Sequence, residues 1–218
     1  MDAFADLARH ARALRKPHPS IVGVEAIAKR GIDVAVCAAA LVILGPLLAV
    51  VAGLICLVDG RPVLYRQVRL GLRGKRFTIL KFRTMRPDAE EGLGPMWSLK
   101  DDPRCTKLGA WLRRRGIDEL PQLWNIIRGD MTLVGPRPER PEFVKEFSTS
   151  YPGYDIRHAV RCGLTGYAQI HGWRGATGLE DRLRHDLYYI RHWSLWLDLR
   201  ILALTLVRGW SERTRDGA

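Results

Sequence analysis

Two adjacent acidic residues, Asp118 and Glu119, follow closely on a run of basic side chains, Arg113–Arg115. They stand at the start of an expected helix, where the positive helix end and the nearby guanidinium groups favour an ionised carboxylate. We therefore expect a depressed pKa for Asp118, which makes it a poor general acid but a usable nucleophile toward phosphorus. An ordinary helix cap neutralised by arginine has the same local sequence, and this stretch alone does not choose between the two interpretations.

Basic side chains on constrained backbone form a second set of candidates. Arg137 stands between Pro136 and Pro138, so its planar guanidinium is presented at little entropic cost and suits bidentate recognition of a phosphate. A rigid surface turn would have the same sequence. Lys81 and Arg83 alternate along an expected strand, where they face phosphates, lipid headgroups or water.

Several other chemistries leave no motif in the chain. It has no Walker A loop, no GxGxxG that opens a helix, no GxSxG and no HExxH. The 4 cysteines are far apart and the 6 histidines show no ligand pattern, so we expect reduced thiols and neither a zinc site nor a disulfide framework. The excess of 35 Lys and Arg over 23 Asp and Glu, formally +12, favours anionic partners such as nucleic acid, anionic lipid or phosphorylated substrates.

The longest apolar run, Ile32–Val58, has 27 residues and a single acid, Asp33, near its start. It exceeds the ~20 residues that cross a bilayer as a helix. Gly45 and Pro46 stand in its middle, and proline must kink or break a helix there. Basic clusters flank both ends, which places both on the cytoplasmic side. The pattern favours a re-entrant hairpin that turns near Pro46 over a spanning helix or a buried core helix.

The rest of the chain must position the charged residues. Alternating β-prone stretches at 63–68 and 77–82, around a glycine-containing turn, predict a β-hairpin. Residues 187–210 combine Tyr and Trp with Leu, Ile and Arg, which predicts an amphipathic helix at a membrane interface or, alternatively, on a soluble core.

Two helices are expected on either side of the acidic pair. The first covers residues 106–115 and ends at Gly116. The second begins near Asp118, accommodates Pro121 in its first turn and ends at Gly129. One face of this second helix is expected to be apolar, formed by Leu120, Leu123, Trp124 and Ile127.

These elements predict an α+β, mostly helical, monotopic membrane protein: a broken re-entrant helix, a β-hairpin packed on helices, and interfacial amphipathic helices. We expect a basic N-terminal extension at 1–25 and the membrane hairpin at 26–60. A catalytic domain on the cytoplasmic face follows at 61–210, with a tail at 211–218.

Several short motifs occur in a fixed order along the chain. They are Lys29-Arg30-Gly31-Ile32-Asp33, Gly60-Arg61-Pro62-Val63-Leu64-Tyr65-Arg66-Gln67, Gly74-Lys75 through Phe77, Lys81-Phe82-Arg83-Thr84-Met85, Asp118-Glu119-Leu120-Pro121-Gln122, Gly129-Asp130-Met131 and Gly135-Pro136-Arg137-Pro138. Together they resemble the monotopic polyprenyl-phosphate phosphoglycosyl transferase family, also called bacterial sugar transferases. The resemblance covers roughly four fifths of the chain, from Lys29 to about Leu206.

The resemblance implies an enzyme of the bacterial inner membrane whose active site lies on the cytoplasmic face. It implies that Asp118 attacks the β-phosphate of a UDP-sugar and releases UMP, and that the phosphosugar then passes to undecaprenyl phosphate with help from Glu119. Mg²⁺ is the implied cofactor, with Asp118 as its protein ligand. Substrate- or phosphate-binding candidates carried over or retained are Arg113, Arg137, Lys81, Arg83 and Gln122.

The C-terminal half is similar to the exopolysaccharide-initiating branch, many of whose members transfer glucose 1-phosphate or galactose 1-phosphate. Three positions depart from the family pattern. Cys162 stands where proline is usual, Ala176 where glutamate is common, and Gly45 where serine often precedes the proline. The Ala176 departure bears on the choice of sugar, whereas the Gly45 departure leaves Pro46 in place.

Two other functions compete with this interpretation. A membrane-tethered protein that binds nucleic acid or anionic lipid would explain the charge but not the acidic pair, and no nucleic-acid module occurs, so we expect no nucleic-acid partner. A lipid-phosphate phosphatase would share the anionic substrate but transfer to water. Membrane lipid is an expected partner under the transferase interpretation, and a homodimer is a further expectation.

Overall fold

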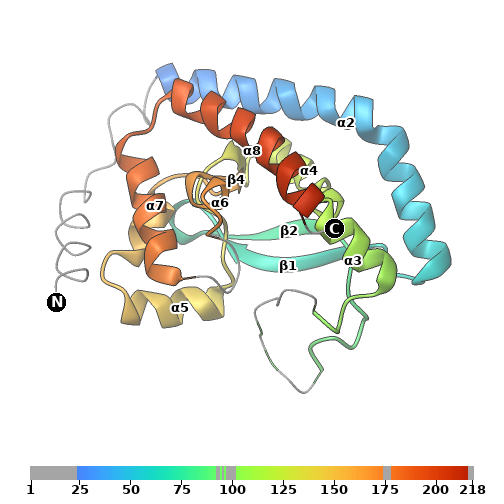
Figure 1. Cartoon of the computed structure of the whole chain (residues 1–218). Helices are drawn as coiled ribbons and strands as arrows, with labels where there is room; N and C mark the ends of the chain where they lie inside the picture. The colour runs from blue at the N-terminus through green and yellow to red at the C-terminus, as the bar shows by residue number, and fades with distance from the viewer. Residues whose placement is uncertain (1–23, 92–93, 95, 97–101, 174–177, 216–218) are drawn as a thin grey trace.

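The structure is a computed structural model of the chain, and it describes residues 24–91, 94, 96, 102–173 and 178–215 (Figure 1). From residue 208 onward it describes the backbone alone. Most of the expected basic extension lies outside the described residues, as do Ala176 and the last three residues of the tail.

A single long helix, α2 (Val24–Val58), carries the apolar run across the top of the molecule in Figure 1 and then bends down toward the hairpin. Because the helix is continuous through Pro46, the predicted break is a bend and not an interruption. Of the helices within the described residues, α2 is the one long and apolar enough to cross a membrane, and 11% of its most apolar window is buried against the protein. Many of its other apolar side chains are exposed, among them Val42, Ile43, Val50 and Leu57.

The basic motif near the start of α2 anchors this helix to the body. Arg30 donates hydrogen bonds to two carbonyls in the last turn of α4 (Gln122–Arg128). Asp33 accepts a hydrogen bond from the Thr132 hydroxyl, and Lys29 pairs with Asp198. Farther along, Val51 and Ile55 pack on the hairpin and on α3 (Lys107–Arg114).

The predicted β-hairpin is confirmed as β1 (Leu64–Leu70) and β2 (Arg76–Phe82), which pair antiparallel around the 3₁₀ turn η2 (Leu72–Gly74). Asn125 of α4 is fully buried against the free edge of β2. Its side chain accepts a hydrogen bond from Leu80 N (2.9 Å) and donates one to Thr78 O (2.7 Å), as a neighbouring strand would. This contact fixes α4 beside the hairpin.

The helix before the acidic pair is confirmed as α3, capped by Thr106 and followed by Gly116 at φ 64°. The prediction for the second helix was wrong in two respects. Asp118 lies in a separate 3₁₀ turn, η3 (Ile117–Glu119), and α4 begins only at Gln122. Trp124 is 53% exposed, because the face that packs inward is formed by Leu123, Asn125 and Ile126.

The remaining elements pack around a short parallel pair, β3 (Thr132–Val134) and β4 (Gly163–Thr165). They are α5 (Pro141–Ser150), η4 (Tyr154–Ala159), α6 (Tyr167–Ile170), α7 (Leu179–Arg191) and α8 (Leu195–Arg215). The predicted C-terminal helix therefore consists of two helices, α7 and α8. Exposed apolar side chains on α8 are Trp196, Leu199, Leu206 and Val207.

A close backbone approach holds α3 in place and makes a stability prediction. A Cβ at Gly109 would lie 2.0 Å from Thr84 O, whereas a Cβ at Gly31, also in a helix, would meet nothing within 4 Å. We expect Gly109→Ala to destabilise the protein by roughly 1–3 kcal/mol through overpacking. Gly31→Ala should be neutral or slightly stabilising because alanine favours helix. Thermal unfolding of the two variants in detergent tests this, and equal melting temperatures would contradict the predicted steric conflict.

Candidate active site

An open groove of about 900 Å³ lies between the hairpin, the segment that follows β2, α3 and the start of α5. Its basic lining is dense and consists of Arg66, Arg69, Lys81, Arg83, Arg86, Arg104, Arg113 and Arg140. Asp118 lines the same groove. The arrangement combines one candidate nucleophile with many cations, which suits a substrate that carries several negative charges.

Asp118 is only 6% exposed, and burial raises the pKa of its carboxyl above the ordinary value. The charge of Glu119 raises the pKa further, while Lys81, Arg113 and Arg137 lower it. The predicted depression of this pKa is therefore wrong. Asp118 lies outside the α-helix whose N-terminus was expected to stabilise it, and burial has the largest effect.

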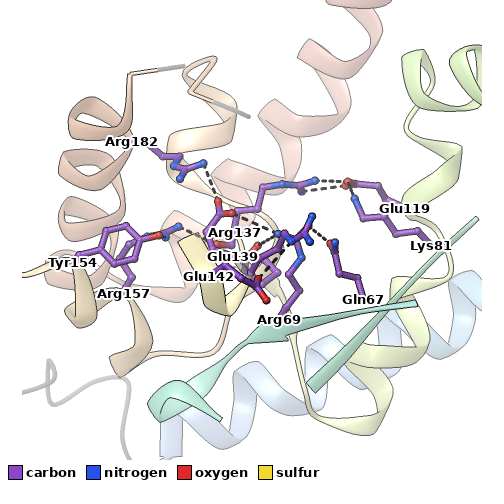
Figure 2. Close-up of polar contacts among 12 residues, drawn as sticks. Gln67, Arg69, Lys81, Glu119, Arg137, Glu139, Glu142, Tyr154, Arg157 and Arg182 are labelled. Carbon is purple, nitrogen blue, oxygen red and sulfur yellow. Dashed lines mark hydrogen bonds and ion pairs between the residues drawn. The ribbon is translucent and has the colours of Figure 1, made fainter. Parts of the chain in front are cut away.

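Glu119 has the opposite electrostatic environment. Its carboxylate forms an ion pair with Lys81 Nζ (2.7 Å) and a second, hydrogen-bonded ion pair with the Arg137 guanidinium, as Figure 2 shows. We call these two ion pairs the Glu119 clamp. Burial alone would raise the pKa of Glu119, but Arg137 and Lys81 together hold it well below its usual range. The two adjacent acids therefore have opposite pKa shifts: the pKa of the ion-paired Glu119 is lowered, and that of the buried Asp118 is raised.

Arg137 is placed by close contacts between glycine-containing segments. A Cβ at Gly163 would lie 2.1 Å from Gly135 N. Because glycine has no Cβ, β4 can approach the segment before Arg137 closely at this position. Arg157 then donates a hydrogen bond to Arg137 O (2.9 Å). The guanidinium of Arg157 is itself buried and forms an ion pair with Asp186 (2.7 Å).

The structure does not bring every predicted site residue to the groove in the same way. Lys81 and Arg113 line it, and Arg113 also donates to Cys105 Sγ (3.2 Å). Arg83 is 5% exposed, and its guanidinium donates to the carbonyls of Asp59 and Gly60, both at 2.6 Å. Its guanidinium is thus committed to the end of α2, which makes Arg83 a positioning residue rather than a free phosphate ligand.

Gln122 is fully buried, and its amide nitrogen and oxygen have no hydrogen-bond partner within the described residues. It supports the start of α4 directly behind the acidic pair and does not line the groove. The predicted substrate contact of Gln122 therefore has no accessible surface in this conformation.

Sequence reasoning did not single out several residues that shape the site. Asn125 was missed although an asparagine between apolar neighbours on a short helix signals a buried hydrogen-bonding role. Arg157 and Asp186 carried no local signal, because they meet 29 positions apart in the chain. The Glu90–Arg140 ion pair at the groove joins residues 50 positions apart and was invisible for the same reason.

The carboxylates fit only one kind of metal site. Within the described residues no three His, Cys, Asp or Glu side chains gather as a metal cage. Glu119 is already ion-paired with two cations, which leaves Asp118 as the available carboxylate of the acidic pair. Mg²⁺ is often held by one or two carboxylates together with substrate phosphates, and this donor set fits that arrangement.

The sequence profile of the family described as "bacterial sugar transferase" matches residues 24–212, and the chain belongs to this family. It is 40% identical over 88% of its length to a UDP-glucose:undecaprenyl-phosphate glucose-1-phosphate transferase of Klebsiella pneumoniae, and 40% identical over 84% to a UDP-N-acetylgalactosamine-undecaprenyl-phosphate N-acetylgalactosaminephosphotransferase of Aeromonas hydrophila. These matches cover 42% and 44% of the two relatives, so the chain spans about two fifths of their length. An exopolysaccharide production protein PSS of Rhizobium leguminosarum is 40% identical over 88% of this chain and 98% of its own length.

The clamp on Glu119 predicts a pH-dependent contribution to stability. Glu119→Gln should destabilise the protein at neutral pH by about 1–3 kcal/mol, because it leaves Lys81 and Arg137 without their partner. Since the folded pKa of Glu119 is depressed, its contribution is complete above the unfolded value of about 4.3 and is lost as the pH falls through the folded pKa. Unfolding measured from pH 7 to pH 3 should show the difference between wild type and variant narrowing in acid.

The exposed Glu146 supplies the matched control, since Glu146→Gln should leave unfolding unchanged. Adding Lys81→Met to Glu119→Gln should recover part of the loss by removing an uncompensated charge. A pH-independent difference for Glu119→Gln would contradict the clamp.

Proposed function

We propose that this chain transfers a sugar 1-phosphate from a UDP-sugar to undecaprenyl phosphate, releases UMP and starts polysaccharide assembly. The observation that carries the proposal is Asp118, a buried carboxylate on the wall of a groove whose charged side chains are mostly cationic. Family membership and the names of the relatives support this choice of substrates. UDP-glucose and UDP-galactose are the first donors to test.

In the first half-reaction, an Asp118 oxygen forms a bond to the β-phosphorus of the UDP-sugar. The bond from that phosphorus to the bridging oxygen breaks, and UMP leaves with the electron pair. Burial and the charge of Glu119 raise the pKa of Asp118, whereas the nearby Lys81, Arg113 and Arg137 charges lower it and so favour the ionised nucleophile. The groove arginines offset the charge of the diphosphate.

In the second half-reaction, an oxygen of undecaprenyl phosphate attacks the aspartyl phosphosugar, and the Asp118 carboxylate leaves. The products are the free enzyme and a sugar-diphosphate lipid. Glu119 assists by holding Lys81 and Arg137 beside the transferring phosphoryl group. In the first half-reaction, Asp118 is the residue that would hold Mg²⁺, and the ion would supply further positive charge at the phosphates of the UDP-sugar.

Replacement of Asp118 tests the nucleophile. Asp118→Asn should abolish UMP release from UDP-sugars, since an amide cannot form the acyl phosphate, and the loss should be at least about 1,000-fold. Purified protein in detergent is mixed with UDP-sugars, with and without undecaprenyl phosphate, and UMP is quantified. Without undecaprenyl phosphate, the wild-type enzyme should release an amount of UMP limited by the amount of enzyme. With undecaprenyl phosphate, it should release UMP over many turnovers. Full turnover by Asp118→Asn, or no UMP from any UDP-sugar, would refute the proposed reaction.

We propose further that α2 enters the inner membrane from the cytoplasmic side and returns to it, with the groove on that side. The exposed apolar surface of α2, its bend and the basic residues beyond both its ends support this topology. Single cysteines near residues 25 and 65, in a cysteine-free background, should both react with a membrane-impermeant reagent only when the cytoplasmic side is accessible. Labelling from opposite sides would instead establish a spanning helix.

A further inference from the structure

Two acidic side chains, Asp118 and Glu90, line the described part of the groove among eight basic ones. Asp118 is assigned to the chemistry. A second carboxylate at this place needs its own explanation, because it repels the phosphates that the basic residues attract. Groups that a carboxylate recognises without such repulsion are neutral hydrogen-bond donors, above all hydroxyls.

The geometry around Glu90 fits that kind of ligand. Its Oε1 accepts a hydrogen bond from Arg140 Nη1 (2.8 Å), while the Glu90 side chain remains 36% exposed and that of Arg140 13% exposed. The other carboxylate oxygen, Oε2, has no donor within the described residues, so it is available to a ligand. The Arg140 guanidinium also lies over the Phe143 ring, 5.7 Å from its centroid.

Aromatic rings flank this ion pair on the groove wall. Phe143 and Tyr65 both line the groove, and Tyr65 is 40% exposed. Tyr65 lies within electrostatic reach of Glu90 and Arg140 and also of Arg113, which acts on Asp118 as well. The Glu90–Arg140 pair is therefore part of the same groove as the nucleophile and not a separate surface feature.

We infer that Glu90, oriented by Arg140, recognises vicinal hydroxyls of a sugar ring in the nucleotide-sugar substrate. Oε2 accepts from the hydroxyls, Arg140 donates to hydroxyl oxygens of the ring, and the partly exposed ring of Tyr65 contacts the C–H surface of the sugar. The inference rests on the proposed function for the identity of the substrate. The ring is either the transferred sugar or the ribose of the uridine, since both present vicinal hydroxyls.

Binding measurements in an Asp118→Asn background test the inference without turnover. Dissociation constants of UDP-glucose and UDP are measured in detergent for this background and for the same background carrying Glu90→Gln. We expect Glu90→Gln to weaken UDP-glucose about 10-fold or more, as for loss of hydrogen bonds to a charged group. Unchanged UDP binding would then identify the transferred sugar as the ring, and equal weakening of both ligands would identify the ribose.

Two further variants separate recognition from a structural bridge. Glu91→Gln changes an exposed neighbouring glutamate and should alter neither constant. The double variant Glu90→Arg with Arg140→Glu keeps an ion pair across the groove but moves the carboxylate to the other position. Its thermal stability should match that of the Asp118→Asn background, whereas its affinity for UDP-glucose should stay as low as that of Glu90→Gln. The inference is overturned if Glu90→Gln binds both ligands as its background does, or if the double variant restores affinity. Failure of the background protein and of wild type to bind either ligand would overturn the proposed function itself.

Discussion

The ion pairs of Glu119 with Lys81 and Arg137 are the interaction on which the site depends, because they join three segments that are distant in sequence. Lys81 comes from β2, Glu119 from η3, and Arg137 from the segment after β3. The same contacts give the two acids different environments. Lys81 and Arg137 hold the pKa of Glu119 well below its usual range, and the charge of Glu119 raises the pKa of the neighbouring Asp118. This difference supports Asp118, and not Glu119, as the proposed nucleophile.

A second, buried network of ion pairs fixes the backbone of Arg137, which is part of the Glu119 clamp. Arg157 donates a hydrogen bond to the carbonyl of Arg137, and Asp186 forms an ion pair with Arg157. Nearby, Glu139 pairs with Arg182 (2.9 Å), and both side chains are almost fully buried. Buried ion pairs of this kind add little net stability, but removing one partner is costly, so they define a single arrangement. We attribute the fixed position of Arg137 to that property.

Local sequence patterns predicted more of the fold than of the candidate site. Alternation predicted the hairpin, and Gly116 predicted the end of α3, because both signals lie within a few residues. The properties of the site residues depend on burial, and burial depends on contacts between segments that are distant in sequence. Residue type alone made Arg83 a phosphate ligand and gave Asp118 a depressed pKa, whereas burial commits Arg83 to the end of α2 and raises the pKa of Asp118. Glu119 meets Lys81 across 38 positions, which no local pattern reveals.

The place of Arg83 explains how an apolar helix and a charged groove can serve one reaction. Arg83 follows β2 directly and binds the carbonyls that end α2, while Pro62 and Val63, just beyond that end, line the groove. The helix with the largest apolar surface therefore terminates at the rim of the groove that contains Asp118. If α2 lies in the bilayer as proposed, a lipid phosphate at the membrane surface reaches the groove at this rim. A water-soluble nucleotide sugar then needs no path through the membrane, because the groove is open to solvent.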